Sequence, residues 1–382
     1  MDPIPIVKHL SETIGIRFFG SAAEREAADY IAGQFAGRGL QPQLEPFRVM
    51  GWDLRSEPTL SITAPEPRTI AAYPLVYSLA TGAGGVEGTL RYVGKCLILG
   101  VLMWDRYEVV GGDGSVAAWV IVRENGPAST MPATLDDSGM PMVVISREDG
   151  DRVSNWLAAG EEVRVRLGID AEFTPGALSH NVIAEQPGTH PEDGYVVVCG
   201  HYDTEYNSPG AIDNASGIAG ILDMVERLAD AAPRRTVRYI AFGAEEPMML
   251  GSYWHVRRLK DRGELRACAA TVCLDMIACN EPTWIWATDG ERRIKDLAER
   301  SANAIGIPEK YGPIEWITDP WATSDQYPFQ AEGVGVMCCT WHGDTWPHTH
   351  LPSDTVAEFD SAVYNDTLDL CEPVVRDLAR DL

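Results

Sequence analysis

The sequence is poor in basic residues and lacks the long apolar runs of membrane proteins. It has 31 Lys and Arg against 56 Asp and Glu among 382 residues, which gives a formal net charge of −25. Nucleic acids and anionic membranes are bound by basic surfaces, so we expect neither as a partner. No run of 18 apolar residues is present, which argues against a membrane-spanning helix.

Cysteine is also scarce and forms no pattern typical of metal fingers or disulfide scaffolds. There are eight cysteines, none in a CxxC pair, and the spacing of Cys268, Cys273 and Cys279 does not fit a zinc finger. The first residues, Met1 to Lys8, lack the basic start and long apolar core of a secretory signal. We therefore expect a cytoplasmic protein with reduced thiols.

The pattern of apolar residues changes along the chain and predicts two domains. Ser21-Ala22-Ala23-Glu24 has the capping-box pattern and opens a helix that ends near Gly37. Residues 52–174 contain short apolar runs separated by Gly and Pro, which indicates a β-rich module. After residue 175, buried strands alternate with helices, which indicates a mixed, mainly parallel sheet with helices on both faces. We expect an α/β catalytic domain formed by residues 1–50 and 176–382, with a β-rich domain inserted at 51–175.

Polar residues follow four of the predicted strands, at the edge where a parallel sheet binds its ligands. They are His201 and Asp203 after 196–200, Glu245 and Glu246 after 237–242, Asp275 after 270–274, and a histidine-rich loop, 342–350, after 333–340. Asp213 lies in a turn-rich segment, 210–217, that opens a helix. Imidazole and carboxylate without thiolate are the ligand set of a catalytic zinc or another first-row metal site.

Each of these residues alone has an ordinary structural explanation. A histidine at a strand end is commonly hydrogen-bonded, an adjacent Glu-Glu pair is commonly solvated, and Asp213 fits a helix N-cap. Asp275 is harder to explain in this way, because it lies between apolar residues and a buried charge needs a partner or a metal. The occurrence of all of them at one edge of the sheet favours a metal site.

The same segments resemble the co-catalytic di-zinc aminopeptidases, the family that also contains glutamate carboxypeptidases and glutaminyl cyclases. The matching segments are 200–203, 210–217, 244–246 with 250–252, 274–277, 324–329 and 350–355. The resemblance covers about residues 1–50 and 176–382 and implies a zinc-exopeptidase-like fold. Residues 139–150 resemble the end of a protease-associated domain, so we expect the insert to be of that type.

The resemblance implies two metal sites that share one ligand. His201, Asp213 and Asp275 would bind one ion. Asp213, Glu246 and His350 would bind the other, so that Asp213 bridges the two. The expected cofactor is therefore two divalent metal ions, with zinc as the leading candidate.

The resemblance also implies roles for residues that do not bind metal. Glu245 would be the general base, which takes a proton from the attacking water and passes it to the leaving amine. Asp203 would accept a hydrogen bond from the far ring nitrogen of His201 and fix its tautomer. The spacing of the last motif favours His350 as the ligand over His348, which would then support the site or donate to the oxyanion.

The expected activity is the metal-dependent removal of N-terminal residues from peptides. Three alternatives stay open. The same site could hydrolyse a small non-peptide amide or release a C-terminal residue, it could be a single-zinc cyclising transferase of the glutaminyl cyclase type, or the chain could be a non-enzymatic binding protein. A shared ligand argues against the single-zinc enzyme, and a complete ligand set argues against loss of activity. The sequence does not indicate an oligomeric state.

Overall fold

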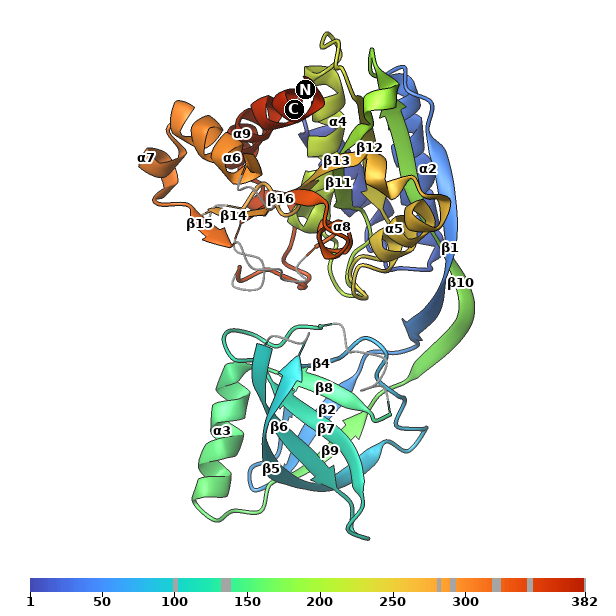
Figure 1. The fold of residues 1–382 in the computed structure, drawn as a ribbon. Helices are drawn as coiled ribbons and strands as arrows, with labels where there is room; N and C mark the ends of the chain where they lie inside the picture. Colours follow the sequence, from blue (N-terminus) through green and yellow to red (C-terminus); the bar gives the residue numbers. More distant parts are fainter. Residues whose placement is uncertain are drawn as a thin grey trace. The chain divides into compact units, whose positions relative to one another are not determined.

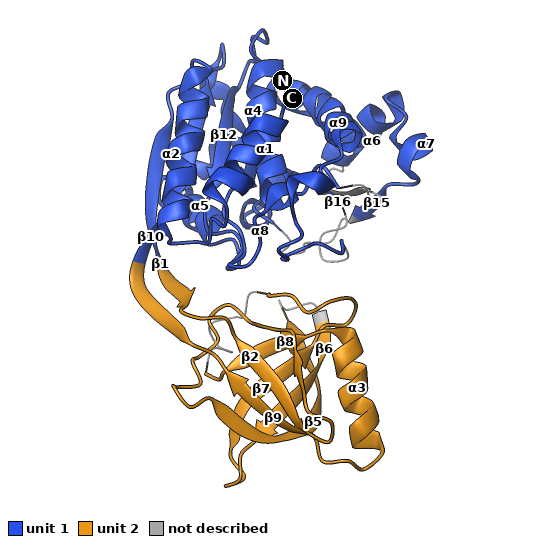
Figure 2. Ribbon diagram, turned by 180° about the vertical axis from the view of Figure 1, so that it is seen from behind, with its two compact units in different colours: residues 1–49, 177–382 blue, residues 50–176 orange. Residues whose placement is uncertain are grey.

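The computed structural model describes residues 1–98, 102–131, 139–279, 283–288, 293–317, 324–341 and 346–380. The chain divides into two compact units (Figure 2). Unit 1 consists of Met1–Val49 and Ala177–Leu382, and unit 2 of Met50–Gly176. Two strands, β1 (Gln43–Leu54) and β10 (Ala171–Gln186), carry the chain across the division.

Unit 1 is built on an eight-stranded mixed sheet (Figure 1). The strand order is β1-β10-β12-β11-β13-β16-β14-β15. The central strands β12, β11, β13 and β16 run parallel, and β10 and β14 join them as antiparallel neighbours. Their bounds are β11 (Tyr195–His201), β12 (Thr236–Phe242), β13 (Cys268–Leu274), β14 (Thr283–Thr288), β15 (Glu315–Ile317) and β16 (Gly335–Trp341).

Helices cover both faces of this sheet, which confirms the predicted α/β class. Along β11, Val196 and Val198 enter one apolar cluster, whereas Val197 and Cys199 enter another. The first cluster includes side chains of α1 (Ile4–Lys8), α2 (Ala22–Gly37), α4 (Gly217–Arg227), α6 (Arg293–Ala304), α7 (Ile307–Tyr311) and α9 (Ser361–Arg380). The second includes side chains of α5 (Leu250–Arg262) and α8 (Tyr327–Ala331). None of the described helices is both long and apolar enough to cross a membrane.

Two predicted helices of unit 1 differ in how closely the structure follows them. The helix expected after Ser21 is α2, and the Ser21 hydroxyl accepts a hydrogen bond from the Glu24 amide at 3.1 Å. The helix expected to open within 210–217 begins only at the end of that segment, because α4 spans Gly217–Arg227. It is preceded by a turn, 211–216, in which Asp213 and Asn214 leave helical φ and ψ angles. This irregular turn, rather than a regular helix end, carries Asp213.

Unit 2 is β-rich, and its described residues include one α-helix, α3 (Arg147–Ala158). Its eight-stranded sheet has the order β3-β2-β9-β5-β6-β7-β8-β4. The pairs β2–β9, β5–β9, β5–β6 and β6–β7 are antiparallel, and β7–β8 is parallel. The bounds are β2 (Thr59–Ala64), β3 (Arg68–Ile70), β4 (Ala72–Pro74), β5 (Val86–Ile98), β6 (Leu102–Val110), β7 (Val116–Val122), β8 (Met142–Ile145) and β9 (Arg164–Gly168). Val153 of α3 packs into a core with strand residues such as Val120 and Val165.

Candidate metal centre

Three parallel strands of unit 1 deliver acidic and imidazole side chains to one edge of the sheet. His201 is the last residue of β11, and Asp275 directly follows β13. Glu245 and Glu246 follow β12 after two further residues. Because β11, β12 and β13 are parallel, their carboxyl ends meet at the same edge. The structure therefore brings these predicted residues together through its topology.

Asp213 reaches the same edge from the turn that precedes α4. The carboxylate of Asp354 accepts hydrogen bonds from the amides of Ile212 at 2.8 Å and Asp213 at 3.0 Å. The Asn214 side chain donates to the carbonyl of Leu274 at 2.9 Å, which ties the turn to the end of β13. These contacts fix the backbone that presents the Asp213 carboxylate.

The two oxygens of Asp213 face different histidines. Oδ1 lies 3.2 Å from Nε2 of His201, and Oδ2 lies 3.5 Å from Nε2 of His350. Nε2 of His201 is also 3.5 Å from Oδ1 of Asp275, and Nε2 of His350 is 3.2 Å from Oε2 of Glu246. Ligand atoms that share a tetrahedral ion at 2.0–2.2 Å are about 3.3–3.6 Å apart. The four distances therefore fit two ions with Asp213 between them.

Two sets of three ligand atoms are close enough to hold an ion together. His201, Asp213 and Glu246 form one, Glu205, Glu246 and His350 form the other, and the atoms of each set lie within 4.8 Å of one another. Glu246 belongs to both. The sequence analysis did not identify Glu205, which lies in the loop between two motifs and belongs to neither.

Burial makes these carboxylates difficult to keep charged without cations. Burial raises the pKa of Glu245 and of Glu205 well above the usual range, and neighbouring carboxylates raise both pKa values further. The pKa of Asp275 is also raised, by burial first and by Asp213 among its neighbours. One oxygen of Asp275 has no hydrogen-bond partner among the described residues. Divalent ions are the groups that would satisfy so many buried negative charges.

The pKa shifts of Asp213 and of the two histidines also reflect the excess of negative charge in the site. Burial raises the pKa of Asp213, but hydrogen bonds from His201 and His350 lower it overall. Burial lowers the pKa of each histidine, but the carboxylates around them, Glu245 for His201 and Glu246 for His350, raise it well above its usual range. The site therefore attracts cations, whether protons or metal ions.

Asp203 supports the site through both its backbone carbonyl and its carboxylate. Nδ1 of His201 lies 3.2 Å from the backbone carbonyl oxygen of Asp203, and its distance to the carboxylate is 3.6 Å. The carboxylate instead accepts hydrogen bonds from the amides of Glu245 at 2.9 Å and Glu246 at 3.1 Å. Asp203 thus orients the backbone of the Glu-Glu pair, while its carbonyl oxygen is the closer partner of the histidine.

The backbone is strained at three positions of this edge. Ala244, Met276 and His350 have φ angles of 52°, 52° and 57°. Left-handed conformations are unfavourable for residues with a Cβ atom and persist where the surrounding structure imposes them. Ala244 precedes Glu245, Met276 follows Asp275, and His350 is itself a predicted ligand. The strain therefore falls where side chains must be aimed into the site.

His348 faces away from the predicted ligands. Its Nδ1 lies 2.9 Å from the Ser353 hydroxyl, and its Nε2 lies 3.6 Å from the Glu358 carboxylate. His350, in contrast, lies beside Asp213 and Glu246. The structure therefore favours His350 over His348 as the metal-facing histidine, as the motif spacing suggests. The remaining histidine of this loop, His342, lies outside the described residues.

A fully buried arginine supports the loop that leads into the site. The guanidinium of Arg17 donates to five backbone carbonyls, at distances between 2.7 and 3.0 Å. The acceptors are Leu10, Gly15, Tyr202, Pro209 and Gly210. Sequence reasoning missed this residue, because no local pattern distinguishes a structural arginine from a surface one.

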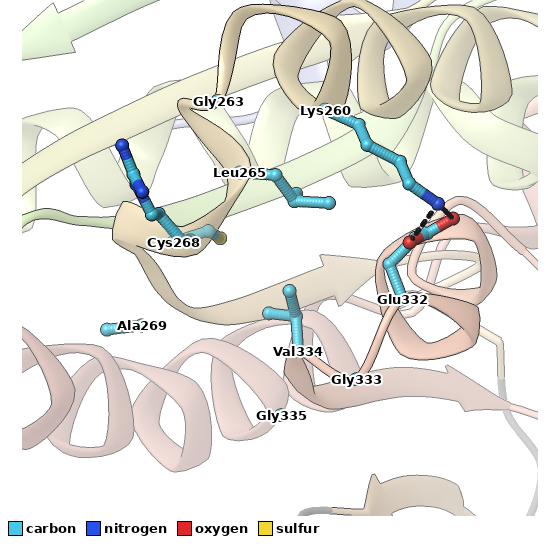
Figure 3. A pocket seen from close by; sticks show the side chains of 10 residues that line it. Lys260, Gly263, Leu265, Cys268, Ala269, Glu332, Gly333, Val334 and Gly335 are labelled. Atoms are coloured by element: carbon cyan, nitrogen blue, oxygen red, sulfur yellow. Dashed lines mark hydrogen bonds and ion pairs between the residues drawn. The ribbon is translucent and has the colours of Figure 1, made fainter.

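A cavity of about 400 Å³ lies at the opposite edge of the sheet, at the amino ends of β13 and β16 (Figure 3). Cys268 and Val334 line it, and Lys260 pairs with Glu332 at 2.7 Å. Its described lining residues include no histidine and only one carboxylate. The metal-binding chemistry of unit 1 therefore belongs to the carboxyl edge of the sheet and not to this cavity.

Known proteins resemble this chain over most of its length. Aminopeptidase YwaD of Bacillus subtilis is 28% identical over 376 residues, which cover 92% of this chain and 78% of that protein. Leucine aminopeptidase 2 of Arthroderma otae is 28% identical over 77% of this chain, and the match spans 63% of its length. The solved structure of BSAP, a zinc aminopeptidase from Bacillus subtilis, superposes with a TM-score of 0.72 at 23% identity, over 99% of this chain and 95% of that chain.

The family assignment comes from a match over the part of the chain that carries the site. Residues 181–375 match peptidase family M28. This segment is about half of the chain and contains all five predicted metal ligands, which are His201, Asp213, Glu246, Asp275 and His350. The chain therefore belongs to peptidase family M28.

Proposed function

We propose that the protein is a metal-dependent aminopeptidase that uses two divalent ions. The single observation that carries this proposal is that the two oxygens of Asp213 face two different histidines, at 3.2 and 3.5 Å. Membership of peptidase family M28 supports hydrolysis of a peptide bond. Relatives named aminopeptidase and leucine aminopeptidase support removal of N-terminal residues.

The proposed ligand sets follow the distances. His201, Asp213 and Asp275 would hold one ion, and Asp213, Glu246 and His350 the other. When bound, such ions polarise the scissile carbonyl and make water a nucleophile at neutral pH. We propose zinc, because imidazole and carboxylate suit it and because a solved relative is described as a zinc aminopeptidase.

Glu245 is the proposed general base. The charges of His201, Glu246 and Asp275 act on its carboxylate, and its backbone amide donates a hydrogen bond to Asp203 at 2.9 Å. Burial raises its pKa well above the usual range, which suits a group that accepts a proton from water and releases it to the leaving amine. Asp203 has the positioning role, because it fixes the amides of both glutamates.

Two other activities would use the same residues. Hydrolysis of a small non-peptide amide or of a C-terminal residue requires the same base and ions. A glutaminyl-cyclase-type transferase would need only one zinc, and the shared carboxylate of Asp213 favours two. An aminopeptidase differs from these enzymes in requiring a free amino terminus on its peptide substrate, so the assay must compare substrates with and without one.

The test combines metal analysis with a matched pair of substrates. Elemental analysis of the purified protein should find two divalent ions per chain. A peptide with a free N-terminus should be cleaved, its N-acetylated form should not, and a chelator should abolish cleavage. Cleavage of the blocked peptide at an equal rate would refute the aminopeptidase assignment. Asp213→Ala should retain fewer than two ions, and two ions at unchanged affinity would refute the shared ligand.

We further propose that unit 2 is a protease-associated-like insert and that the protein is cytoplasmic. The insert is supported by the antiparallel, β-rich architecture of residues 50–176. A reducing compartment is supported by the cysteines, because no disulfide links any two of them in the described parts of the chain. The excess of acidic residues supports a protein that binds no nucleic acid or anionic membrane.

A further inference from the structure

Glu205 is a buried carboxylate that the proposed mechanism does not use. It lies four residues after His201 in the loop that joins β11 to the turn 211–216, and its side chain is fully buried. Neither carboxylate oxygen has a hydrogen-bond partner among the described residues. A carboxylate buried without donors is strongly unfavourable unless it gains a proton or a cation. Glu205 therefore lies where a bound cation would compensate its charge.

The nearest ligand-type atoms to Glu205 indicate where that cation would lie. One oxygen each of Glu205 and Glu246 and one ring nitrogen of His350 lie within 4.8 Å of one another. Two atoms bound to the same ion at 2.0–2.2 Å are at most about 4.4 Å apart. Only a small movement of these three ligand atoms would therefore allow them to bind one ion. Glu205 thus points into the part of the site that His350 and Glu246 define.

The loop that carries Glu205 is held in place by Arg17. The Arg17 guanidinium donates to the carbonyls of Tyr202 at 2.7 Å and Gly210 at 3.0 Å, on either side of Glu205. The Arg17 amide donates to the Thr204 hydroxyl at 2.9 Å, directly before Glu205. The carboxylate is therefore presented by a fixed backbone, as a metal ligand must be.

We propose that Glu205 is a fourth protein ligand of the ion that Asp213, Glu246 and His350 hold. This inference rests on the two-ion site of the proposed function. It makes the site asymmetric, because three protein ligands would hold the ion beside His201 and four would hold the ion beside His350.

The charges of the site are consistent with this role. With Glu205, four ligand carboxylates surround two divalent ions, so that their formal charges cancel. The other three belong to Asp213, Glu246 and Asp275. Without Glu205, the three other ligand carboxylates would leave the set with one net positive charge. A substrate ammonium group is the competing partner for Glu205, but the side chain is fully buried, which favours a resident ion.

The test uses zinc alone as the probe and compares Glu205→Leu and Glu205→Gln with the control Glu24→Gln. Glu24 is also buried, but its oxygens accept hydrogen bonds from the Gly20 amide at 2.6 Å and the Ser179 hydroxyl at 2.5 Å. Competition with a chromogenic chelator should show that Glu205→Leu lowers the affinity for one of the two zinc ions by about 10–100-fold. The affinity for the other zinc ion should stay within about twofold of the wild-type value. Glu205→Gln should give a smaller loss, and Glu24→Gln should bind both ions normally.

Melting temperatures separate a ligand from a structural residue. In metal-free protein, Glu205→Leu should be at least as stable as wild type, because it removes a buried charge without partners. In zinc-loaded protein, the same variant should gain less stability from zinc than wild type gains. A purely structural role would lower the melting temperature in both states, and that result would overturn the inference.

Three further results are decisive. If both Glu205 variants hold two zinc ions at wild-type affinity, the inference is wrong, although the proposed function stands. If zinc affinity is unchanged while KM rises for peptides with a free N-terminus, the inference is also wrong, and Glu205 binds the substrate ammonium group. If wild-type protein binds no divalent ion, the proposed function fails and this inference fails with it.

Discussion

The two units of this protein treat charged side chains in opposite ways. In unit 1, every residue of β11 is buried, and carboxylates of Glu205, Asp275 and Asp325 have oxygens without a hydrogen-bond partner among the described residues. In unit 2, β9 alternates buried and exposed residues, and its charged side chains project outward. The unpartnered buried atoms described for unit 2 are arginine Nε atoms and one serine hydroxyl. Buried anions therefore mark the unit that performs the chemistry.

This contrast follows from the architecture of each sheet. A parallel sheet covered on both faces has no solvated side, so charges enter it only at strand ends, where ligands bind. An antiparallel sheet with one solvated face can carry many charges as cross-strand pairs, such as Arg91 with Glu108 at 2.6 Å. Substitutions of charged residues should accordingly be costly in unit 1 and tolerated in unit 2.

The largest effect is expected from Glu245→Gln. A mild effect of this substitution would contradict the proposed difference between charged residues of unit 1 and of unit 2. The variant keeps the shape of the side chain but removes the proposed base, so kcat should fall by about 10²- to 10⁴-fold. Both metal ions should be retained, because Glu245 is not a proposed ligand. Steady-state assays with elemental analysis would check this result, with Glu161→Gln in unit 2 as a control. A kcat near that of wild type would refute the assignment of the base.

The next largest effect is expected from Arg17→Met, which tests stability rather than chemistry. Burial lowers the pKa of Arg17 to about 10, so it remains charged at neutral pH. Its loss removes one donor from each of five backbone carbonyls, of which those of Leu10 and Gly210 keep a backbone amide donor, and we expect destabilisation by about 3–5 kcal/mol. Urea denaturation would measure the change, with Arg164→Met in unit 2 as the control. Equal stability of the two variants would contradict the proposed role.

The sequence predicted those parts of the site that follow regular structure. His201 and Asp275 could be identified because each stands at the end of an apolar strand, and parallel strands share an edge. The adjacent glutamates could be identified because they follow β12. The α/β class followed from the alternation of strands and helices, which needs only local patterns of apolar residues.

The sequence could not predict the parts that depend on irregular loops. Glu205 and Arg17 lie in segments whose paths are set by long-range contacts, such as the hydrogen bond from Arg17 to Gly210 across 193 positions. The family resemblance implies the role of Asp203 toward His201, whereas the hydrogen bond from the Glu245 amide to its carboxylate is visible only in the structure. In both cases the deciding partner is distant in sequence.

A smaller effect, dependent on pH, is expected from Glu45→Gln in unit 1. Burial raises the pKa of Glu45, but hydrogen bonds from His255 at 2.8 Å and Asn181 at 2.9 Å, with the charge of Arg258, lower it overall. A carboxyl whose pKa is lower in the folded state stabilises the protein above its unfolded pKa, and this contribution is lost as the pH falls through the folded pKa. At pH 7 the variant should lose about 1–2 kcal/mol.

Urea titrations between pH 7 and pH 3 would sharpen this prediction. The difference in unfolding free energy between wild type and Glu45→Gln should shrink as the pH falls below about 4.3, the ordinary pKa of glutamate. Asp151→Asn in unit 2, whose carboxylate is 61% exposed and pairs with Arg147, serves as the control and should show little change at any pH. A difference for Glu45→Gln that stays constant or grows at low pH would contradict the assigned direction of the pKa shift.

The smallest effect is expected from Arg91→Ala in unit 2. Arg91 pairs with Glu108 across β5 and β6 at 2.6 Å, but its side chain is 57% exposed. Exposed ion pairs contribute about 0–1 kcal/mol, because water screens the attraction and ordering two long side chains costs entropy. A double-mutant cycle with Glu108→Ala should therefore give a coupling energy below about 1 kcal/mol. The kcat and the metal content should equal those of wild type, because the described contacts of Arg91 lie within unit 2 and include no proposed ligand. A coupling energy as large as the effect of Arg17→Met, or a fall in kcat, would mean that charge in the β-rich unit is not confined to its surface and that this unit contributes to the reaction.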